Sequence, residues 1–379
     1  MQDVLNYIEG LKKTQAWANL INTVEASPWH REANVAVHTE MVLNQYVTRF
    51  APIRTDDQNR VALLALAFHD FGKPSAEEEL EKKDGSGEKY RRYAGHEQDS
   101  AVAFTEQWLK DDHLARLVTK EEARVIRWII EHHLPYGFKD TTKVSQLRAA
   151  TAELGHYEQT FYDCLRSDAA GRISDDHETK LQNVENWIAD FQAIAPLRTR
   201  QTSEKQKCFI LIGPSGSGKS TFIAGNARVC DRVISLDIVR RQYWEKNCEH
   251  DISALSEKDA YAAAWKFCTE QDSEGFSKEY QRVVKANFDH AAIAKCDIFV
   301  DNTNSSRKAR AQIVQFARQH GMKIVAVEFW NRFDTLVGRQ TTRPDKQVPV
   351  SSVKAQVFAQ TCAWLGGEVD QVVLRTERD

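Results

Sequence analysis

The residues best suited to chemistry in this chain of 379 residues form a glycine-rich string. It reads Gly213-Pro214-Ser215-Gly216-Ser217-Gly218-Lys219-Ser220-Thr221 and follows the apolar run 208–212. Glycines let successive backbone N–H groups turn toward a bound phosphate, and the helix that follows presents its positive end to the same place. Lys219 can reach the β- and γ-phosphates, and Ser220 can bind Mg²⁺. The string therefore predicts a nucleotide-binding loop, or P-loop, for ATP or another nucleoside triphosphate with Mg²⁺.

Two aspartates follow later apolar runs, at the carboxyl ends of predicted strands, where open α/β sheets place their chemistry. Asp237 follows the run 232–236 and could accept the proton of a hydroxyl group that attacks the γ-phosphorus. Arg240, three residues later, could bind a phosphate of the acceptor. Asp301 closes the run 297–301 and could bind Mg²⁺ through its water shell. Either aspartate alone could equally be a helix cap or a turn residue.

Two arginines late in the chain could complete such a site. Arg339 and Arg343 are four residues apart, which predicts that both lie on one face of a helix. Guanidinium groups there could clamp phosphate oxygens that gain charge in the transition state. An exposed arginine pair is also typical of a solvated helix face, but no better cationic candidate follows the last predicted strand.

The first half of the chain carries a second set of chemical residues. They are His38, His69, Asp70, His96, His132, His133 and Asp168. Imidazole nitrogens and carboxylate oxygens bind divalent transition metals, and a shared aspartate can bridge two ions. His69 and Asp70 end an apolar helical run, where core packing gains nothing from polar groups, and Lys73 follows one turn later. A single histidine is usually an ordinary polar residue, but the set together predicts a metal site.

The elements that must position these residues differ between the two halves. Residues 1–196 are predicted to be helical almost throughout, without strands, and the charged segment near 77–87 is predicted to be a surface loop. From Cys208 onward, short β-rich runs at 208–212, 232–236, 297–301 and 323–329 alternate with helical stretches. This alternation is typical of a parallel sheet in an α/β domain. The polar segment 197–207 is predicted to link a domain at 1–196 to one at 208–379.

Composition limits the remaining classes of function. The chain is 42% hydrophobic and 28% charged, as in ordinary soluble proteins, and its net charge of −3 means that any nucleic acid must be bound by local arginines. Seven scattered cysteines without a C-x-x-C pair favour reduced thiols over a disulfide or zinc framework. The apolar run 61–68 is too short to span a membrane, and the first ten residues do not resemble a signal peptide. We therefore expect a cytoplasmic protein without membrane contacts.

Over about residues 30–170 the chain resembles the HD phosphohydrolase superfamily. The pattern is H…HD…H…H…D, with the local strings His38-Thr39-Glu40, His69-Asp70-Phe71-Gly72-Lys73, Gly95-His96-Glu97 and Glu131-His132-His133. The resemblance implies an all-α HD-superfamily domain that holds two divalent transition metal ions. Mn, Fe, Co, Ni and Zn remain equally open, because His/Asp sites accept all of them.

The same resemblance assigns roles to individual residues. It implies that one ion is held by His38, His69, Asp70 and Asp168, and the other by His96 and His132, with Asp70 bridging. His133 is the open alternative to His132, which is our first choice. Lys73 would either donate a proton to the leaving oxygen or hold the substrate phosphate.

From residue 208 to about 360 the chain resembles the polynucleotide 5′-hydroxyl kinase family. The matching strings are Gly-x-x-x-x-Gly-Lys-Ser, Ile-Ser-x-Asp-x-x-Arg, Val-Asp-x-Thr and Arg-x-x-x-Arg followed by Asp-Lys-Gln-Val. The resemblance implies an α/β P-loop kinase domain in which Lys219 and Ser220 bind ATP and Mg²⁺ and Asp237 is the general base. Arg240 would bind the acceptor, and Arg339 and Arg343 would form the lid. The stretch 244–280 is longer than such a kinase needs, and its role is left open.

An HD domain ahead of such a kinase resembles the bacterial bifunctional end-healing proteins called HD-Pnk. That resemblance implies a kinase for the 5′-OH ends of RNA or DNA and a metal-dependent phosphoesterase for 2′,3′-cyclic phosphate ends, with an RNA ligase as the enzyme that acts next. Two alternatives remain open. One is a nucleotide-signalling HD phosphohydrolase with a regulatory P-loop ATPase, and the other is a non-catalytic RNA-binding adaptor.

Overall fold

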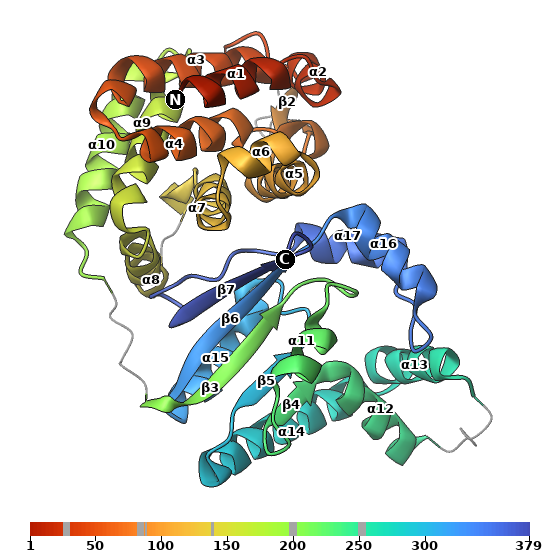
Figure 1. Ribbon diagram of the computed structural model, residues 1–379. Helices are drawn as coiled ribbons and strands as arrows, with labels where there is room; N and C mark the ends of the chain where they lie inside the picture. Colours follow the sequence, from red (N-terminus) through yellow and green to blue (C-terminus); the bar gives the residue numbers. More distant parts are fainter. Residues whose placement is uncertain (26–30, 82–86, 88, 138–139, 197–202, 249–254) are drawn as a thin grey trace. The chain divides into compact units, whose positions relative to one another are not determined.

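A computed structural model describes residues 1–25, 31–81, 87, 89–137, 140–196, 203–248 and 255–379. The chain divides into two compact units, Met1–Arg198 and Thr199–Asp379 (Figure 1). The first unit is helical, and the second contains a parallel five-stranded sheet. This confirms the predicted fold class of a helical domain followed by an α/β P-loop domain. Of the predicted linker, residues 203–207 belong to a strand and 197–202 lie outside the described residues.

The helices of the first unit surround a buried central helix, α4. The described helices of this unit are α1 (Gln2–Leu11), α2 (Gln15–Asn22), α3 (Val35–Arg49), α4 (Asp56–Phe68), α5 (His96–Lys110), α6 (Asp112–Leu117), α7 (Lys120–Glu131), α8 (Thr141–Ala152), α9 (Glu158–Ala170) and α10 (His177–Ala193). A capping box between Thr55 and Gln58 starts α4. The helix is then apolar on every side, from Val61 to Phe68, and packs against α1, α3, α5, α7 and α9. The polar residues that follow α4 therefore emerge in the middle of the unit.

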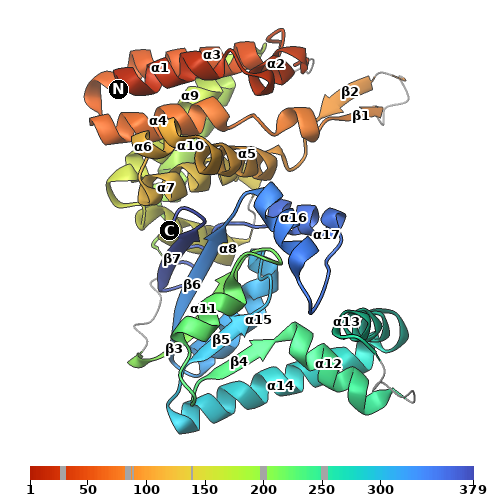
Figure 2. The same ribbon diagram turned by 45° about the vertical axis from the view of Figure 1, so that its right-hand side comes forward.

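The first unit also contains a short antiparallel hairpin of β1 (Glu78–Glu81) and β2 (Lys89–Arg92), so the prediction that it has no strand was wrong (Figure 2). The strands pair charge with charge, for example Glu79 with Arg91. Opposite charges across a strand pair stabilise the pair, but they leave no alternation of apolar and polar residues for a sequence pattern to detect. The turn between the strands lies mostly outside the described residues.

The sheet of the second unit has the order β4-β5-β3-β6-β7, and every strand pair is parallel. Its strands are β3 (Ser203–Ile212), β4 (Arg232–Ser235), β5 (Ile298–Asp301), β6 (Met322–Trp330) and β7 (Gln371–Thr376). The four predicted strands are present, and β3 starts before its predicted first residue, Cys208. Strand β7, at one edge of the sheet, was not predicted. The central position of β3 places the glycine-rich string in the middle of the carboxyl edge of the sheet.

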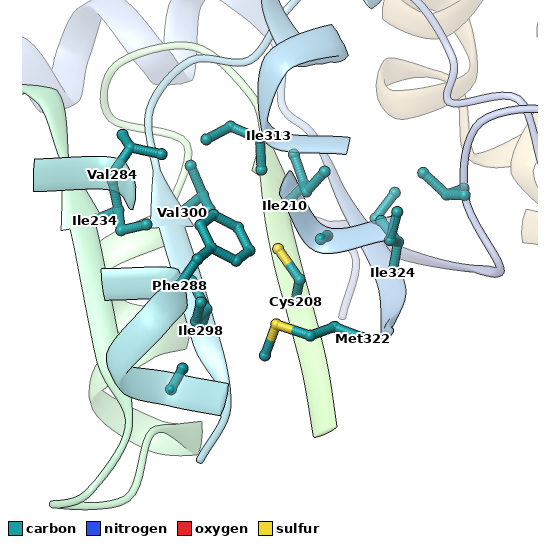
Figure 3. Close-up of a cluster of buried hydrophobic side chains, with 14 of the residues drawn as sticks. Cys208, Ile210, Ile234, Val284, Phe288, Ile298, Val300, Ile313, Met322 and Ile324 are labelled. Atoms are coloured by element: carbon teal, nitrogen blue, oxygen red, sulfur yellow. The ribbon is translucent and has the colours of Figure 1, made fainter. Parts of the chain in front are cut away.

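Helices cover both faces of this sheet. The described helices of the second unit are α11 (Lys219–Asn226), α12 (Leu236–Asn247), α13 (Glu257–Lys266), α14 (Ser273–Ala294), α15 (Arg307–Gln319), α16 (Phe333–Thr342) and α17 (Val350–Phe358). On one face Phe288 of α14 and Ile313 of α15 pack against the strands, as Figure 3 shows. On the other face Phe222 and Ile223 of α11 pack against β3 and β6. Because both faces are covered, the strands read as continuous apolar runs, which is why they were predictable.

Among the described residues, no helix combines the length and the apolar character that crossing a membrane requires.

Candidate metal centre and nucleotide site

The first unit brings six of the predicted metal ligands into two adjacent buried groups. One group is His38, His69 and Asp168, and the other is Asp70, His96 and His133; within each group the ligand atoms lie within 4.8 Å of one another. Asp70 connects the groups. Its Oδ2 lies 3.2 Å from Nε2 of His69, and its Oδ1 lies 3.1 Å from Nε2 of His96. A carboxylate with one oxygen toward each group is suited to bridge two cations.

The orientation of the four imidazoles fits metal ligands. In each of His38, His69, His96 and His133, Nδ1 lies 2.6–3.3 Å from a backbone carbonyl oxygen. The carbonyls are those of Gly171, Leu66, Tyr93 and Ile130. A carbonyl can only accept, so Nδ1 carries a hydrogen and Nε2 is the nitrogen left to bind a metal. This is how proteins orient histidine ligands.

His69 supplies a second observation that fits a metal. Its Nε2 is buried, faces the carboxylates of Asp70 and Asp168 at 3.2 and 3.8 Å, and makes no hydrogen bond to any described residue. A buried polar atom without a partner is costly, and a cation between the nitrogen and the carboxylates would remove that cost. The residues therefore fit a pair of divalent metal ions.

The geometry favours His133, the open alternative, over His132, our first choice. His132 belongs to neither ligand group; its ring stacks on Trp128, with centroids 4.3 Å apart, and its Nδ1 lies 2.8 Å from the Trp128 carbonyl oxygen. His133 instead places Nε2 3.2 Å from Nε2 of His96 and 3.9 Å from Oδ1 of Asp70. Helix α7 ends at Glu131, so the two histidines leave its end in different directions.

A glycine explains how the loop after α4 reaches α5. Asp70 lies in the turn after α4, and His96 is the first residue of α5. Between them in space is Gly72, where an added Cβ would come within 2.3 Å of the His96 carbonyl oxygen. The N–H of Gly72 donates to Oγ of Ser100, 2.8 Å away, in the first turns of α5. Only glycine allows this close approach, which holds Asp70 beside His96.

Buried charges around the centre are paired. Burial alone would raise the pKa of Asp70, but His69 and Lys73 outweigh it and hold the pKa well below its usual range. Burial alone would likewise lower the pKa of Lys73, but Asp70 and Glu25, both in contact with its Nζ, raise it instead. A lysine held so firmly in its charged form is a poor proton donor at neutral pH. Of the two predicted roles of Lys73, the geometry favours holding negative charge.

Sequence reasoning missed one cation of this centre, Arg172. Its Nη2 donates to Oδ2 of Asp168 at 2.8 Å, and its buried Nε has no hydrogen-bond partner in the described part of the chain. Arg172 lines a cavity of about 460 Å³ together with Asp70, Lys73, His96 and His133. Its position one helical turn after Asp168 was a usable signal. A guanidinium with a free N–H beside a metal centre is suited to bind a phosphate oxygen.

In the second unit, the glycine-rich string forms a loop between β3 and α11. Gly216 and Gly218 have φ angles of +84° and +101°, a region that side chains disfavour. Lys219 is buried and its Nζ donates to the carbonyls of Gly213 and Pro214 at 2.8 and 2.7 Å. Burial lowers the pKa of Lys219 to about 8. The amine is thus held inside the loop, where the predicted phosphates would bind.

The two predicted Mg²⁺ ligands lie together. Ser220 is the second residue of α11, and its Oγ donates to Oδ2 of Asp301 at the end of β5, 3.1 Å away. A hydroxyl and a carboxylate at this spacing fit Mg²⁺, which prefers oxygen ligands and keeps several waters. Asp301 is therefore more than a turn residue.

A cavity of about 930 Å³ opens along the carboxyl edge of the sheet. It is lined by the P-loop, including Thr221, and by Asp237, Arg240, Asp301, Arg339 and Arg343. Residues after β6 and β7, such as Asn331 and Glu377, also line it. Ligands of open α/β sheets bind at this edge, where the strand order reverses. Every residue predicted for the kinase half lines this one cavity except Gly213, which lies at the start of the loop.

Asp237 lies in the first turn of α12, whose N-cap is Ser235, so Asp237 is not the cap residue. Its Oδ1 accepts from Nη1 of Arg240 at 2.9 Å, and its Oδ2 is in contact with Nζ of Lys346. Among the residues that the structure describes, the buried Nε of Arg240 has no hydrogen-bond partner. Lys346 was not predicted as a site residue, although it stands in the string that carried the kinase resemblance. The carboxylate is thus held between two cations inside the cavity.

Arg339 and Arg343 both reach the P-loop, but not from one helix face. Nη1 of Arg339 donates to the Gly216 carbonyl at 2.9 Å, and Nη1 of Arg343 donates to Oγ of Ser215 at 3.2 Å. Helix α16 ends at Thr342, and Arg343 is extended. The cause is Pro344, because a proline disfavours helical backbone in the residue before it.

Comparison with known protein families agrees with the fold observed for the second unit. Residues 209–366 match the family model described as an AAA domain, a match that runs from β3 past α17 and includes the P-loop, Asp237 and both arginines. No curated protein matches the chain. The second unit therefore contains a kinase-like P-loop domain that uses a nucleotide.

Proposed function

We propose that this chain is a bifunctional nucleic acid end-healing enzyme. The second unit would transfer the γ-phosphoryl group of ATP to the 5′-OH end of RNA or DNA, and the first would hydrolyse 2′,3′-cyclic phosphate or related phosphoester ends. The single observation that carries the proposal is the carboxylate of Asp237, placed between Arg240 and Lys346 in the cavity that holds the P-loop. Transfer to a hydroxyl group needs such a base, with cations beside it for an anionic acceptor.

In the kinase reaction, Asp237 accepts the proton of the 5′-OH group as its oxygen attacks the γ-phosphorus. The new bond is the 5′ P–O bond, the broken bond joins the β-γ bridging oxygen to the γ-phosphorus, and ADP leaves. Lys219 and the backbone N–H groups of the loop bind the phosphates, and Arg339 and Arg343 face the charge that develops on the transferred group. Mg²⁺, held by Ser220 and Asp301, would neutralise the β- and γ-phosphate oxygens.

In the phosphoesterase reaction, the substrate phosphate would lie in the cavity beside the histidines. Two divalent ions there, held by the two ligand groups, would supply charge neutralisation and an activated water. Arg172 and Lys73 would hold the phosphate oxygens from opposite ends of the ligand set. Burial of all these groups strengthens their electrostatic effect.

The two activities complement each other chemically. Cleavage of RNA by transesterification leaves a 5′-OH on one fragment and a 2′,3′-cyclic phosphate on the other. A kinase and a phosphoesterase in one chain convert both ends to forms that a ligase can join. The partners implied are broken RNA or DNA ends, followed by an RNA ligase.

One assay separates this proposal from its alternatives. The protein is mixed with γ-labelled ATP and an oligonucleotide with a 5′-OH end, and label on the oligonucleotide and free phosphate are both counted. Label transfer supports the kinase. Free phosphate alone supports a regulatory ATPase attached to a nucleotide-signalling phosphohydrolase, and neither product supports an adaptor.

Matched variants then test whether the sites are independent. Asp237→Ala should abolish label transfer and spare hydrolysis of the 2′,3′-cyclic phosphate, and Asp70→Ala should do the reverse. Asp334→Ala removes an exposed carboxylate that lines neither cavity and should leave both activities unchanged. Loss of both activities in each of the first two variants would contradict two independent sites.

A further inference from the structure

Helix α13 lies in the stretch 244–280, whose role was left open, and lines one side of the P-loop cavity. The helix has two different faces. Ala260 and Ala264 are buried against Trp244 of α12. Tyr261 and Trp265, each one residue further on and four apart, line the cavity. The packed face fixes the helix, and the aromatic face is turned toward the ligand space.

These aromatic side chains lie on the side of the cavity that holds the proposed base. Nζ of Lys346 lies 5.3 Å from the centroid of the Tyr261 ring, and the same amine is in contact with Asp237. Trp265, one helical turn beyond Tyr261, leaves 45% of its surface exposed. The aromatic face of α13 therefore continues outward from the place where the attacking hydroxyl must sit.

A contact fixes α13 to the segment that follows α16. Nζ of Lys258 donates to Oε1 of Gln347, the residue after Lys346, and Figure 1 shows this segment reaching down to α13. The aromatic residues, the base and the cations around it thus have a defined arrangement. Such a site is better prepared for binding than one on an untethered helix.

We propose that Tyr261 and Trp265 form a base-stacking surface for the first unpaired nucleotides of the acceptor strand. Every nucleobase has a π-face, so stacking on aromatic rings binds single strands without regard to sequence. Arg240, with a free Nε, and Lys346 lie next to this surface and can bind backbone phosphates. A lone exposed tryptophan is ordinary. A tyrosine and a tryptophan at helical spacing, beside the proposed base Asp237, are explained by a ligand with stacked bases. The inference rests on the proposed kinase function and specifies its acceptor as a single-stranded end.

The test is steady-state kinase kinetics with two acceptors. Both are single-stranded oligonucleotides with a 5′-OH, one with normal bases and one with abasic sites at its first two positions. We expect Trp265→Ala to raise KM for the normal acceptor by about tenfold, the effect of losing one stacked base. KM for ATP should not change, the abasic acceptor should be equally poor with both proteins, and Trp265→Phe should restore most of the loss.

The control variant is Ile293→Ala, which removes an exposed apolar side chain of α14 outside the cavity. It should leave every constant unchanged. An equal KM for the normal acceptor in wild type and Trp265→Ala would overturn the stacking surface while leaving the kinase in place. A raised KM for ATP alone would assign the tryptophan to the adenine and also overturn it. Absence of label transfer by the wild type to any acceptor would instead overturn the kinase itself.

Discussion

Separate replacement of His132 and His133 should show that one histidine contributes to stability and the other to metal binding. His133 lines the open cavity with its Nε2 toward Asp70 and His96, whereas His132 is stacked in the core on Trp128. We therefore expect His133→Ala to lose metal and phosphoesterase activity with little loss of stability. We expect His132→Ala to lose stability but to keep its metal.

The magnitudes follow from the contacts. His132→Ala removes an aromatic stack and a hydrogen bond to the Trp128 carbonyl, together about 2 kcal/mol. For a unit of 198 residues, this should lower Tm by about 4–8 °C. His133→Ala removes one of three ligands of its group, but water can fill the space because the side chain borders a cavity. The metal content should fall from about two ions per chain to about one.

The assay is metal analysis of the purified full-length chain, with calorimetry and hydrolysis of a 2′,3′-cyclic phosphate measured on the same preparations. Label transfer by the kinase unit is the internal control and should be normal in both variants. The reasoning is refuted if His132→Ala loses an ion while His133→Ala keeps both, because the ligand would then be the histidine that the geometry places in the core.

Three further outcomes test other parts of the structure. Lys219, whose pKa is lowered to about 8, must be charged to hold ATP. The Kd for ATP should therefore rise about tenfold per pH unit above pH 8. A constant Kd in binding titrations from pH 7.5 to 9 would contradict this. Gly72→Ala should destabilise the first unit by about 1–3 kcal/mol in urea unfolding, because its Cβ would meet the His96 backbone. Arg172→Ala should lower phosphoesterase kcat/KM by about tenfold or more, and Arg172→Lys should restore it only in part; an unchanged rate would remove the arginine from the site.

The parts of the fold with strong periodic patterns could be predicted from the sequence. The runs that became β3, β4, β5 and β6 are apolar because helices cover both faces of the sheet. Strand β7 was missed because it lies at the edge of the sheet, half-buried, and ends a stretch of mixed polarity. The β1–β2 hairpin was missed because charge pairs rather than apolar residues hold its strands together.

The site was predictable where its chemistry requires particular residue types. It was less predictable where it depends on the direction in which a side chain points. The P-loop and the histidine–aspartate set could be found because few residue types bind phosphate or metal. The choice between His132 and His133 could not be made from the sequence. Adjacent residues at a helix end point in different directions, and the sequence does not show which of the two side chains faces the other ligands. The end of α16 before Arg343 was predictable in principle, since Pro344 follows it.

One pattern unites the carboxylates proposed for the two reactions and was present in the sequence from the start. Asp70 is paired with Lys73, Asp168 with Arg172 and Asp237 with Arg240, in each case with a cation three or four residues later. Asp237 and Arg240 both lie in α12, where this spacing makes the side chains neighbours, whereas Asp70 and Arg172 lie just beyond the ends of α4 and α9. Against the effect of burial, Lys73 and Arg172 help to hold the pKa of Asp70 and of Asp168 well below the usual range. Each of the three cations also lines a cavity, where it can bind a phosphate. In a chain with a net charge of −3, positive charge is thus concentrated at the two candidate sites themselves.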